Sequence, residues 1–158
     1  MATDEIRNEW GLTEGEEAIA EVYRETIVVF AGTLIRLAGE EAAAKCFREL
    51  AESNIRKLKA AGLLRKGFQD FANGILMTTP RFHQELHWDI PNKRLRITKC
   101  GLLEAAKRLG YEDTPVSILC KATSDAYLDE MVPGYKKTII KRMCIGDDEC
   151  LMTYAKEE

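Results

Sequence analysis

The sequence has no apolar run long enough to cross a bilayer. Its longest apolar stretch, from Thr26 to Leu37, is interrupted by Gly32, Thr33 and Arg36, and it is shorter than the ~20 residues that a transmembrane helix needs. The first residues are acidic where a secretory signal is basic, and no apolar segment follows them. We therefore expect a cytoplasmic protein with no membrane partner, in which Thr26 to Leu37 belong to a core helix.

An excess of positive charge is also missing. The chain has 23 Lys and Arg residues against 26 Asp and Glu residues, which gives a net charge of −3. Such a balance provides no general attraction for phosphate backbones. We therefore expect no nucleic-acid partner. A small-molecule ligand or substrate is the expected partner, and a homo-oligomer is compatible with the sequence.

Standard zinc motifs are absent, because the chain has neither a C-x-x-C pair nor a His-Glu-x-x-His segment. An odd number of cysteines in a reducing cytosol favours thiols, ligands or nucleophiles over a disulfide framework. The five are Cys46, Cys100, Cys120, Cys144 and Cys150. Cys46 lies within an apolar helical stripe, so we expect it to be a small core residue.

No repeat, linker or low-complexity segment divides the 158 residues, and this length is typical of one domain. Apolar residues recur every three or four positions through the first half, which predicts helices over residues 16–38, 40–61 and 66–76. Gly39 is expected to end the first of these helices. Residues 16–79 therefore form the helical part of a single domain.

From residue 80 to 156 the apolar period changes to two. Alternation predicts a hairpin over residues 85–98 and a second one over 138–154, around the turn residues Gly146 to Glu149. Helices are expected over residues 102–109 and 125–131, with a Pro-containing connection between them and with Ser124 or Thr123 capping the second. The sequence thus predicts an α+β fold, in which N-terminal helices are followed by a small antiparallel sheet of hairpins with packed helices.

Four of the five cysteines fall in this second half, each at the end of an expected element. Cys120 precedes the expected helix 125–131, and the positive end of a helix favours the thiolate, which is the nucleophilic and metal-binding form. Asp125 follows closely enough to face the same cavity and orient a water or a substrate amine. Cys100 and Cys150 would complete the wall. Ordinary burial is the alternative for each thiol.

The two histidines, His83 and His87, lie close together in the sequence. On a strand they share a face with Glu85, with neighbours about 6.5 Å apart, a separation that two metal ligands can use. A metal hypothesis therefore combines His83 or His87 with Cys100, Cys120 and Cys150. Thiolates favour zinc or iron. The alternative is a polar outer face of a hairpin.

Several of these segments together resemble a known family. They are the run Arg96-Ile97-Thr98-Lys99-Cys100, then Leu119-Cys120 with Asp125 after it, and the closing Gly146-Asp147-Asp148-Glu149-Cys150. Over roughly residues 88–154, the chain resembles the L-2-amino-thiazoline-4-carboxylic acid hydrolase-like family. The architecture is also similar to the small-ligand domain of the four-vinyl reductase group.

The first resemblance implies a small cytoplasmic hydrolase that acts on a small cyclic C–N or C–S compound, such as a 2-aminothiazoline carboxylate, without a required cofactor. Cys120 would be the nucleophile or a ligand, Asp125 the orienting acid or base, and Cys100 a further catalytic thiol. Arg96 and Lys99 would bind the substrate carboxylate, with Cys150 beside them. The second resemblance implies instead a ligand-binding sensory or accessory domain, because similarity of fold does not transfer chemistry.

Overall fold

The computed structural model describes residues 7–77, 79–111 and 114–157. The expectation that the acidic first residues are not a secretory signal concerns residues that lie largely outside these ranges. The elements are α1 (Glu14–Ala38), α2 (Glu40–Ala60), α3 (Phe68–Leu76), α4 (Thr79–Phe82), β1 (Gln84–Asp89), β2 (Arg94–Cys100), α5 (Gly101–Arg108), α6 (Thr114–Met131), β3 (Tyr135–Lys141), the 3₁₀ turn η1 (Met143–Ile145) and β4 (Cys150–Lys156). The predicted α+β fold is confirmed.

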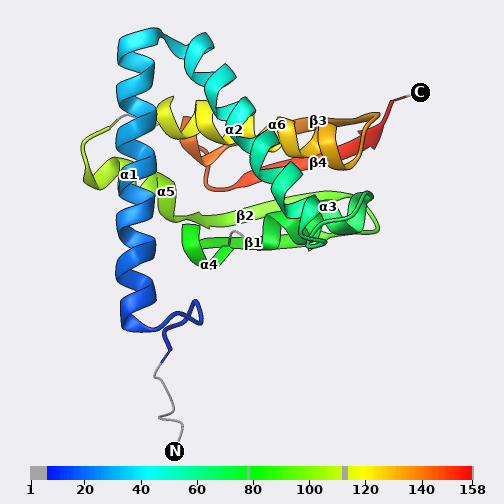
Figure 1. Cartoon of the computed structure of the whole chain (residues 1–158), viewed down its shortest axis with the longest axis horizontal. Helices are drawn as coiled ribbons and strands as arrows, with labels where there is room; N and C mark the ends of the chain where they lie inside the picture. Colours follow the sequence, from blue (N-terminus) through cyan, green and yellow to red (C-terminus); the bar gives the residue numbers. More distant parts are fainter. Residues whose placement is uncertain (1–6, 78, 112–113, 158) are drawn as a thin grey trace, which may run out of the picture.

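The four strands form one antiparallel sheet in the order β1-β2-β4-β3. Each predicted hairpin is present, and the two hairpins join where β4 pairs with β2. The second hairpin is longer than alternation alone predicted, because β3 begins at Tyr135 and its loop contains η1. The helices α3 and α6 cover one face of the sheet, and α2 packs along α6. Figure 1 shows α1 standing across one end of the sheet, roughly perpendicular to the strands.

The main core lies between the sheet and these helices. Aromatic rings dominate it: Phe71 has no exposed surface, and its ring lies 5.3 Å from that of Tyr154 and 5.9 Å from that of Trp88. Phe68 contacts the same rings from the next turn of α3. Edge-to-face pairs of this kind add to the stabilisation that burial gives.

Helix α1 begins with a capping box, in which the Thr13 hydroxyl accepts from the Glu16 amide and the Glu16 carboxylate accepts from the Thr13 amide. Gly39 ends it with φ of 84°, a conformation suited to glycine. The helix is therefore where the sequence predicted it. The prediction of a core helix was wrong in one respect, since its large apolar side chains mostly face outward and its buried face is built from Ala20, Arg24, Val28 and Ala31.

Helix α6 is the largest departure from the sequence prediction. It begins at Thr114, so residues 114–124, expected as a connection, form its first three turns. Pro115 fits here because proline is tolerated in the first turn of a helix. Thr123 and Ser124 were expected to cap a later helix, but their hydroxyls donate back to carbonyls within α6, to Leu119 and Lys121.

Within the described ranges, none of the helices combines the length and the apolar character that a membrane span requires.

Candidate functional site

Four thiols converge at one end of the sheet. Cys100 ends β2, Cys120 lies in α6, Cys144 is in η1 and Cys150 begins β4. Cys120 is close enough to the other three that a negative charge on any of them opposes its ionisation. All five cysteines of the chain are free thiols, and Cys46 lies apart from this thiol cluster, in α2.

A β-bulge turns Cys100 toward the cluster. Ile97 pairs with Leu86 and Lys99 pairs with Glu85, so β2 has one extra residue, Thr98, at this point. Strict alternation after Ile97 would direct Lys99 inward, whereas the extra residue resets the alternation and directs Cys100 inward instead. The Gln84 amide then donates to the Cys100 sulfur over 3.7 Å.

The cluster does not favour thiolates. Burial raises the pKa of Cys100, Cys120 and Cys150 above the ordinary value of a thiol. The Arg142 guanidinium opposes this effect at Cys120 and Cys150, but it is also held by Ser117 through a hydrogen bond to the hydroxyl and a 3.2 Å bond to the carbonyl. The predicted lowering of the Cys120 pKa by a helix start was wrong, because Cys120 is the seventh residue of α6.

Asp125 does not lie in the thiol cluster. Five residues of α-helix turn the chain by about 140° from the starting direction, so Asp125 and Cys120 project toward different sides of α6. The Asp125 carboxylate lies instead 2.5 Å from Lys137 Nζ and 3.0 Å from Lys121 Nζ. The structure therefore gathers Cys100, Cys120 and Cys150, but it separates Asp125 from them.

The histidine side chains do not join the thiol cluster either. His83 precedes β1 with φ of 47°, stacks on Trp10, and places Nε2 2.8 Å from the Glu17 carboxylate. His87 is exposed on the uncovered face of the sheet, within 3.4 Å of the Thr98 hydroxyl. The predicted arrangement of His83 and His87 on one strand face was therefore wrong, because His83 lies outside the strand.

The predicted carboxylate binders are engaged elsewhere. Arg96 pairs with Glu149 at the exposed face of the sheet. Lys99 lies over the Trp10 ring, 5.2 Å from its centroid, and 3.8 Å from Glu9. Among the described residues, no three His, Cys, Asp or Glu side chains are arranged to hold a metal ion, so the metal hypothesis has no geometric support there.

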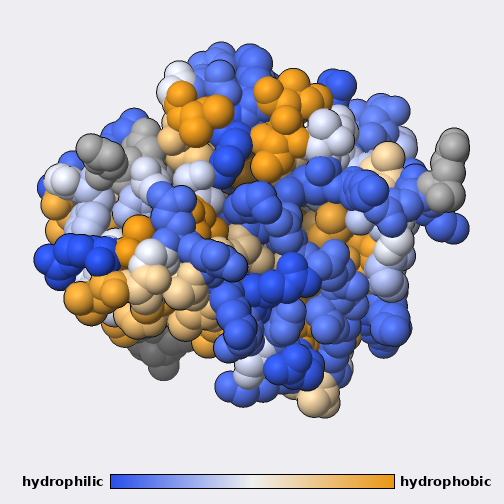
Figure 2. Space-filling model, turned by 90° about the horizontal axis from the view of Figure 1, so that it is seen from above, coloured by the Kyte–Doolittle hydropathy of each residue, from blue (hydrophilic) through white to orange (hydrophobic). Residues whose placement is uncertain are grey.

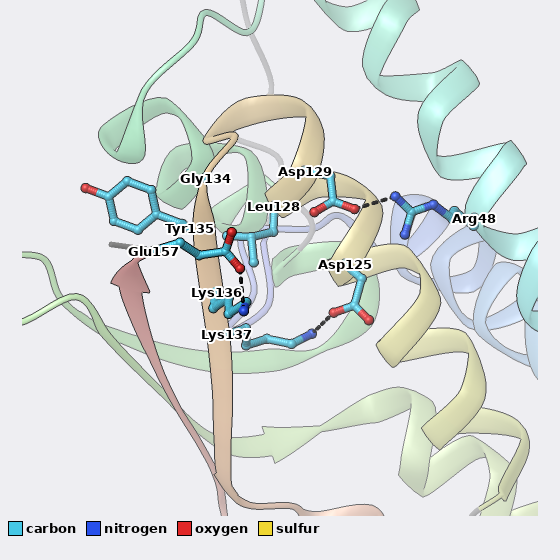
Figure 3. A pocket seen from close by; sticks show the side chains of 9 residues that line it. All are labelled: Arg48, Asp125, Leu128, Asp129, Gly134, Tyr135, Lys136, Lys137 and Glu157. Carbon is cyan, nitrogen blue, oxygen red and sulfur yellow. Dashed lines mark hydrogen bonds and ion pairs between the residues drawn. The ribbon is translucent and has the colours of Figure 1, made fainter.

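A second arrangement centres on Asp125 and forms an open hollow of about 330 Å³ between α2, α6 and β3, close to the C-terminal end of the described chain. We call it the charged groove. Figure 3 shows its side chains. It is lined by Arg48, Asp125, Leu128, Asp129, Gly134, Tyr135, Lys136, Lys137 and Glu157.

Opposite charges form pairs across the charged groove. Arg48 of α2 pairs with Asp129 of α6, and Lys137 of β3 pairs with Asp125 one turn earlier on α6. At the rim, Lys136 Nζ lies 2.6 Å from Glu157. Lys137 is the enclosed member, with only 5% of its side chain exposed. Burial by itself would raise the pKa of Asp125, but the hydrogen bond and charge of Lys137, aided by Lys121, outweigh burial and lower it.

Sequence reasoning missed most of this groove. It selected Asp125 but not Arg48, Asp129 or Lys137, because nothing local links a residue of α2 to one that follows it by 81 positions. The repeat of Asp125 and Asp129 at helical spacing was an available signal, although acidic residues four apart usually indicate only a solvated helix face.

Comparison with known proteins identified no relative: no family model, no curated protein and no solved structure matches this chain. The resemblance to the L-2-amino-thiazoline-4-carboxylic acid hydrolase-like family therefore stays a prediction.

Proposed function

We propose that the chain is a small-molecule-binding protein, whose ligand carries both a carboxylate and a cationic nitrogen and occupies the charged groove. One observation carries this proposal: two pairs of opposite charge, Arg48 with Asp129 and Lys137 with Asp125, line one hollow from three separate elements. The volume of about 330 Å³ is at the lower end of the range for small-molecule sites.

The existing ion pairs supply the complementary groups. A guanidinium has five N–H donors in a planar fork that fits a carboxylate. Arg48 donates through Nε to Glu52 and through one Nη2 hydrogen to Asp129, so its remaining donors, including those on Nη1, are suited to the ligand carboxylate. Asp129 is 56% exposed on its side chain and is suited to accept from the ligand's cationic nitrogen. Lys137 and Asp125 hold each other in the wall of the groove.

Such a ligand has the chemistry that the family resemblance implies, because a 2-aminothiazoline carboxylate combines an amidine with a carboxylate. Hydrolysis by a cysteine, however, needs a thiolate, and burial disfavours that form at Cys120. The binding interpretation, that of a ligand-binding sensory or accessory domain, is therefore the one we propose. It retains the cytoplasmic location expected from the sequence.

Isothermal titration calorimetry with L-2-aminothiazoline-4-carboxylate tests the proposal. Because hydrogen bonds to charged groups contribute about 1.5–3 kcal/mol, we expect Arg48→Met and Asp129→Asn each to weaken binding by roughly ten-fold or more. Arg96→Met is the matched control, since Arg96 also pairs with a carboxylate but lies outside the groove, and it should bind as the unaltered protein does.

Two results would count against the proposal. One is the absence of binding by the unaltered protein at millimolar ligand. The other is equal affinity in Arg48→Met and Arg96→Met. Mass spectrometry of the recovered ligand separates binding from hydrolysis, because ring opening adds one water to the mass, and we expect the ligand to be recovered unchanged.

A further inference from the structure

Helix α1 has an apolar face that the described structure leaves largely exposed, although Tyr23 and Phe30 on this face pack against the rings of Phe82 and Phe47. Its inward face is built largely from small residues, Ala20, Val28 and Ala31, which allow close packing onto the rest of the fold. The opposite face carries the larger apolar side chains, and these are exposed: Ile19 by 72%, Val22, Tyr23, Val29 and Phe30 by lesser fractions, and Leu37 by 76%. A helix that is apolar on both faces is typically covered on both.

The exposed residues form a continuous stripe, which we call the α1 stripe. They follow one another at intervals of three and four residues from Ile19 to Leu37, with Thr26 and Thr33 between them, as in helices that pair along their length. The stripe is about 27 Å long at 1.5 Å per residue. Figure 2 shows apolar side chains at its lower left, the end of the molecule at which Figure 1 places α1, and another group at its upper edge.

The area of the α1 stripe suits a lasting interface. From the exposed fractions of its six large apolar residues, it presents on the order of 600 Å², where one aromatic side chain alone can bury 150–250 Å². That area is as large as the largest apolar patch of a typical monomer, and flanking polar residues would bring it near the roughly 800 Å² per partner of a stable complex.

Charge indicates which partner fits. The N-terminal half of α1 carries Glu14, Glu16, Glu17, Glu21 and Glu25, and it stays acidic although the three guanidinium groups of Arg7, Arg24 and Arg108 pair with four of these five carboxylates. Its last turn carries Arg36. A second copy running antiparallel places Ile19 opposite Leu37 and brings Arg36 level with the partner's acidic half. A parallel copy would set the acidic halves side by side, which like charges disfavour.

We propose that the chain forms a twofold symmetric homodimer through the α1 stripe, with the two α1 helices antiparallel. The interface is self-complementary, as a twofold contact requires. It is independent of the proposed ligand, because no residue of α1 lines the charged groove.

Light scattering after size-exclusion chromatography measures the mass. We expect twice the chain mass of 17.9 kDa for the unaltered protein, and the single-chain mass for the double variant Val22→Glu/Val29→Glu, with the helical circular dichroism of both proteins alike. Leu63→Glu is the matched control, since Leu63 is also exposed, by 59%, but lies outside α1, and it should remain dimeric. A monomeric unaltered protein at 100 µM would overturn the proposal and leave the stripe to a different protein.

Crosslinking tests the orientation. In the antiparallel pair, two Ile19→Cys positions lie about 27 Å apart, beyond a short bis-maleimide, whereas Ile19→Cys and Leu37→Cys lie opposite each other. A mixture of the two variants should therefore give covalent dimers, and Ile19→Cys alone should give no more than the unaltered protein, which controls for the native thiols. Efficient crosslinking of Ile19→Cys alone would show a parallel pair and overturn the proposed arrangement.

Discussion

Lys137 and Asp125 form an ion pair with 2.5 Å between Nζ and Oδ1, and the lysine side chain is almost fully enclosed. The pair lowers the pKa of Asp125, so the carboxylate stabilises the fold above the pKa of an unfolded aspartate, about 3.9, and that stabilisation is lost as the pH falls through the lower folded value. We expect Asp125→Asn to reduce stability at pH 7, because Lys137 loses its partner, and to flatten the loss of stability between pH 5 and about pH 2. Urea unfolding across this range measures both effects.

Asp148→Asn is the matched control for this prediction. Asp148 also pairs with a lysine, at 3.1 Å from Lys141 Nζ, but its side chain is 81% exposed, and exposed pairs contribute little to stability. Its pH profile should therefore stay close to that of the unaltered protein. Parallel profiles for Asp125→Asn and the unaltered protein would contradict the role assigned to the enclosed pair.

Cys120 and Cys46 differ in their surroundings, and their alanine variants should differ accordingly. Cys120 packs among Val116, Leu119 and the neighbouring thiols, so we expect Cys120→Ala to cost about 1–2 kcal/mol of unfolding free energy through the lost contacts. Cys46→Ala should cost less, because Cys46 belongs to none of the three buried apolar clusters of the described residues, whereas Cys120 packs against one of them. Chemical denaturation of both variants gives the comparison.

The same burial predicts slow thiol chemistry. Because the pKa of Cys100, Cys120 and Cys150 is raised, a disulfide reagent at pH 7 should modify these thiols much more slowly in the folded protein than in urea. Peptide mapping of the labelled chain identifies the sites. Fast labelling of Cys120 in the folded protein would restore the nucleophile hypothesis.

Gly101 is required by close packing, whereas Gly15 lies in a helix with room for a side chain. A Cβ at Gly101 would lie 2.5 Å from the Phe82 carbonyl oxygen, whereas a Cβ at Gly15 in α1 would meet nothing within 4 Å. We expect Gly101→Ala to destabilise the fold by about 1–3 kcal/mol and Gly15→Ala to stabilise it by up to about 1 kcal/mol. Thermal unfolding of the two variants should therefore shift in opposite directions.

The elements that the sequence predicted well are those with local signals. Gly39 separates α1 from α2, and alternation around Trp88 and Leu95 defines the first hairpin. Periodicity cannot say which of two apolar faces turns inward, and α1 buries the one made of Ala20, Val28 and Ala31. Small side chains pack closely against a neighbouring helix, so the inward face is selected by the rest of the fold.

The candidate site likewise combines features that the sequence predicted with features that it did not. Cys100 was expected at a strand end, and the bulge at Thr98 that turns it inward has no signature in the alternation of apolar residues. The hydroxyls of Thr123 and Ser124 were interpreted as a helix cap, because the sequence does not distinguish a capping hydroxyl from one that donates back to a carbonyl within a helix. Arg48 and Asp129 meet only because α2 packs along α6, a contact that no local pattern specifies.

Phe71 provides the sharpest test of the core. It is fully buried, and its ring contacts those of Phe68, Trp88 and Tyr154 from α3, β1 and β4. Phe71→Ala should therefore cost about 3–5 kcal/mol, because it removes a buried ring and leaves a cavity that rigid aromatic neighbours fill poorly. Leu76→Ala on the same helix, at a side chain that is 42% exposed, should cost far less. Tryptophan fluorescence during urea unfolding reports on the transition, and similar costs for the two variants would mean that α3 is not held to the sheet by its aromatic face.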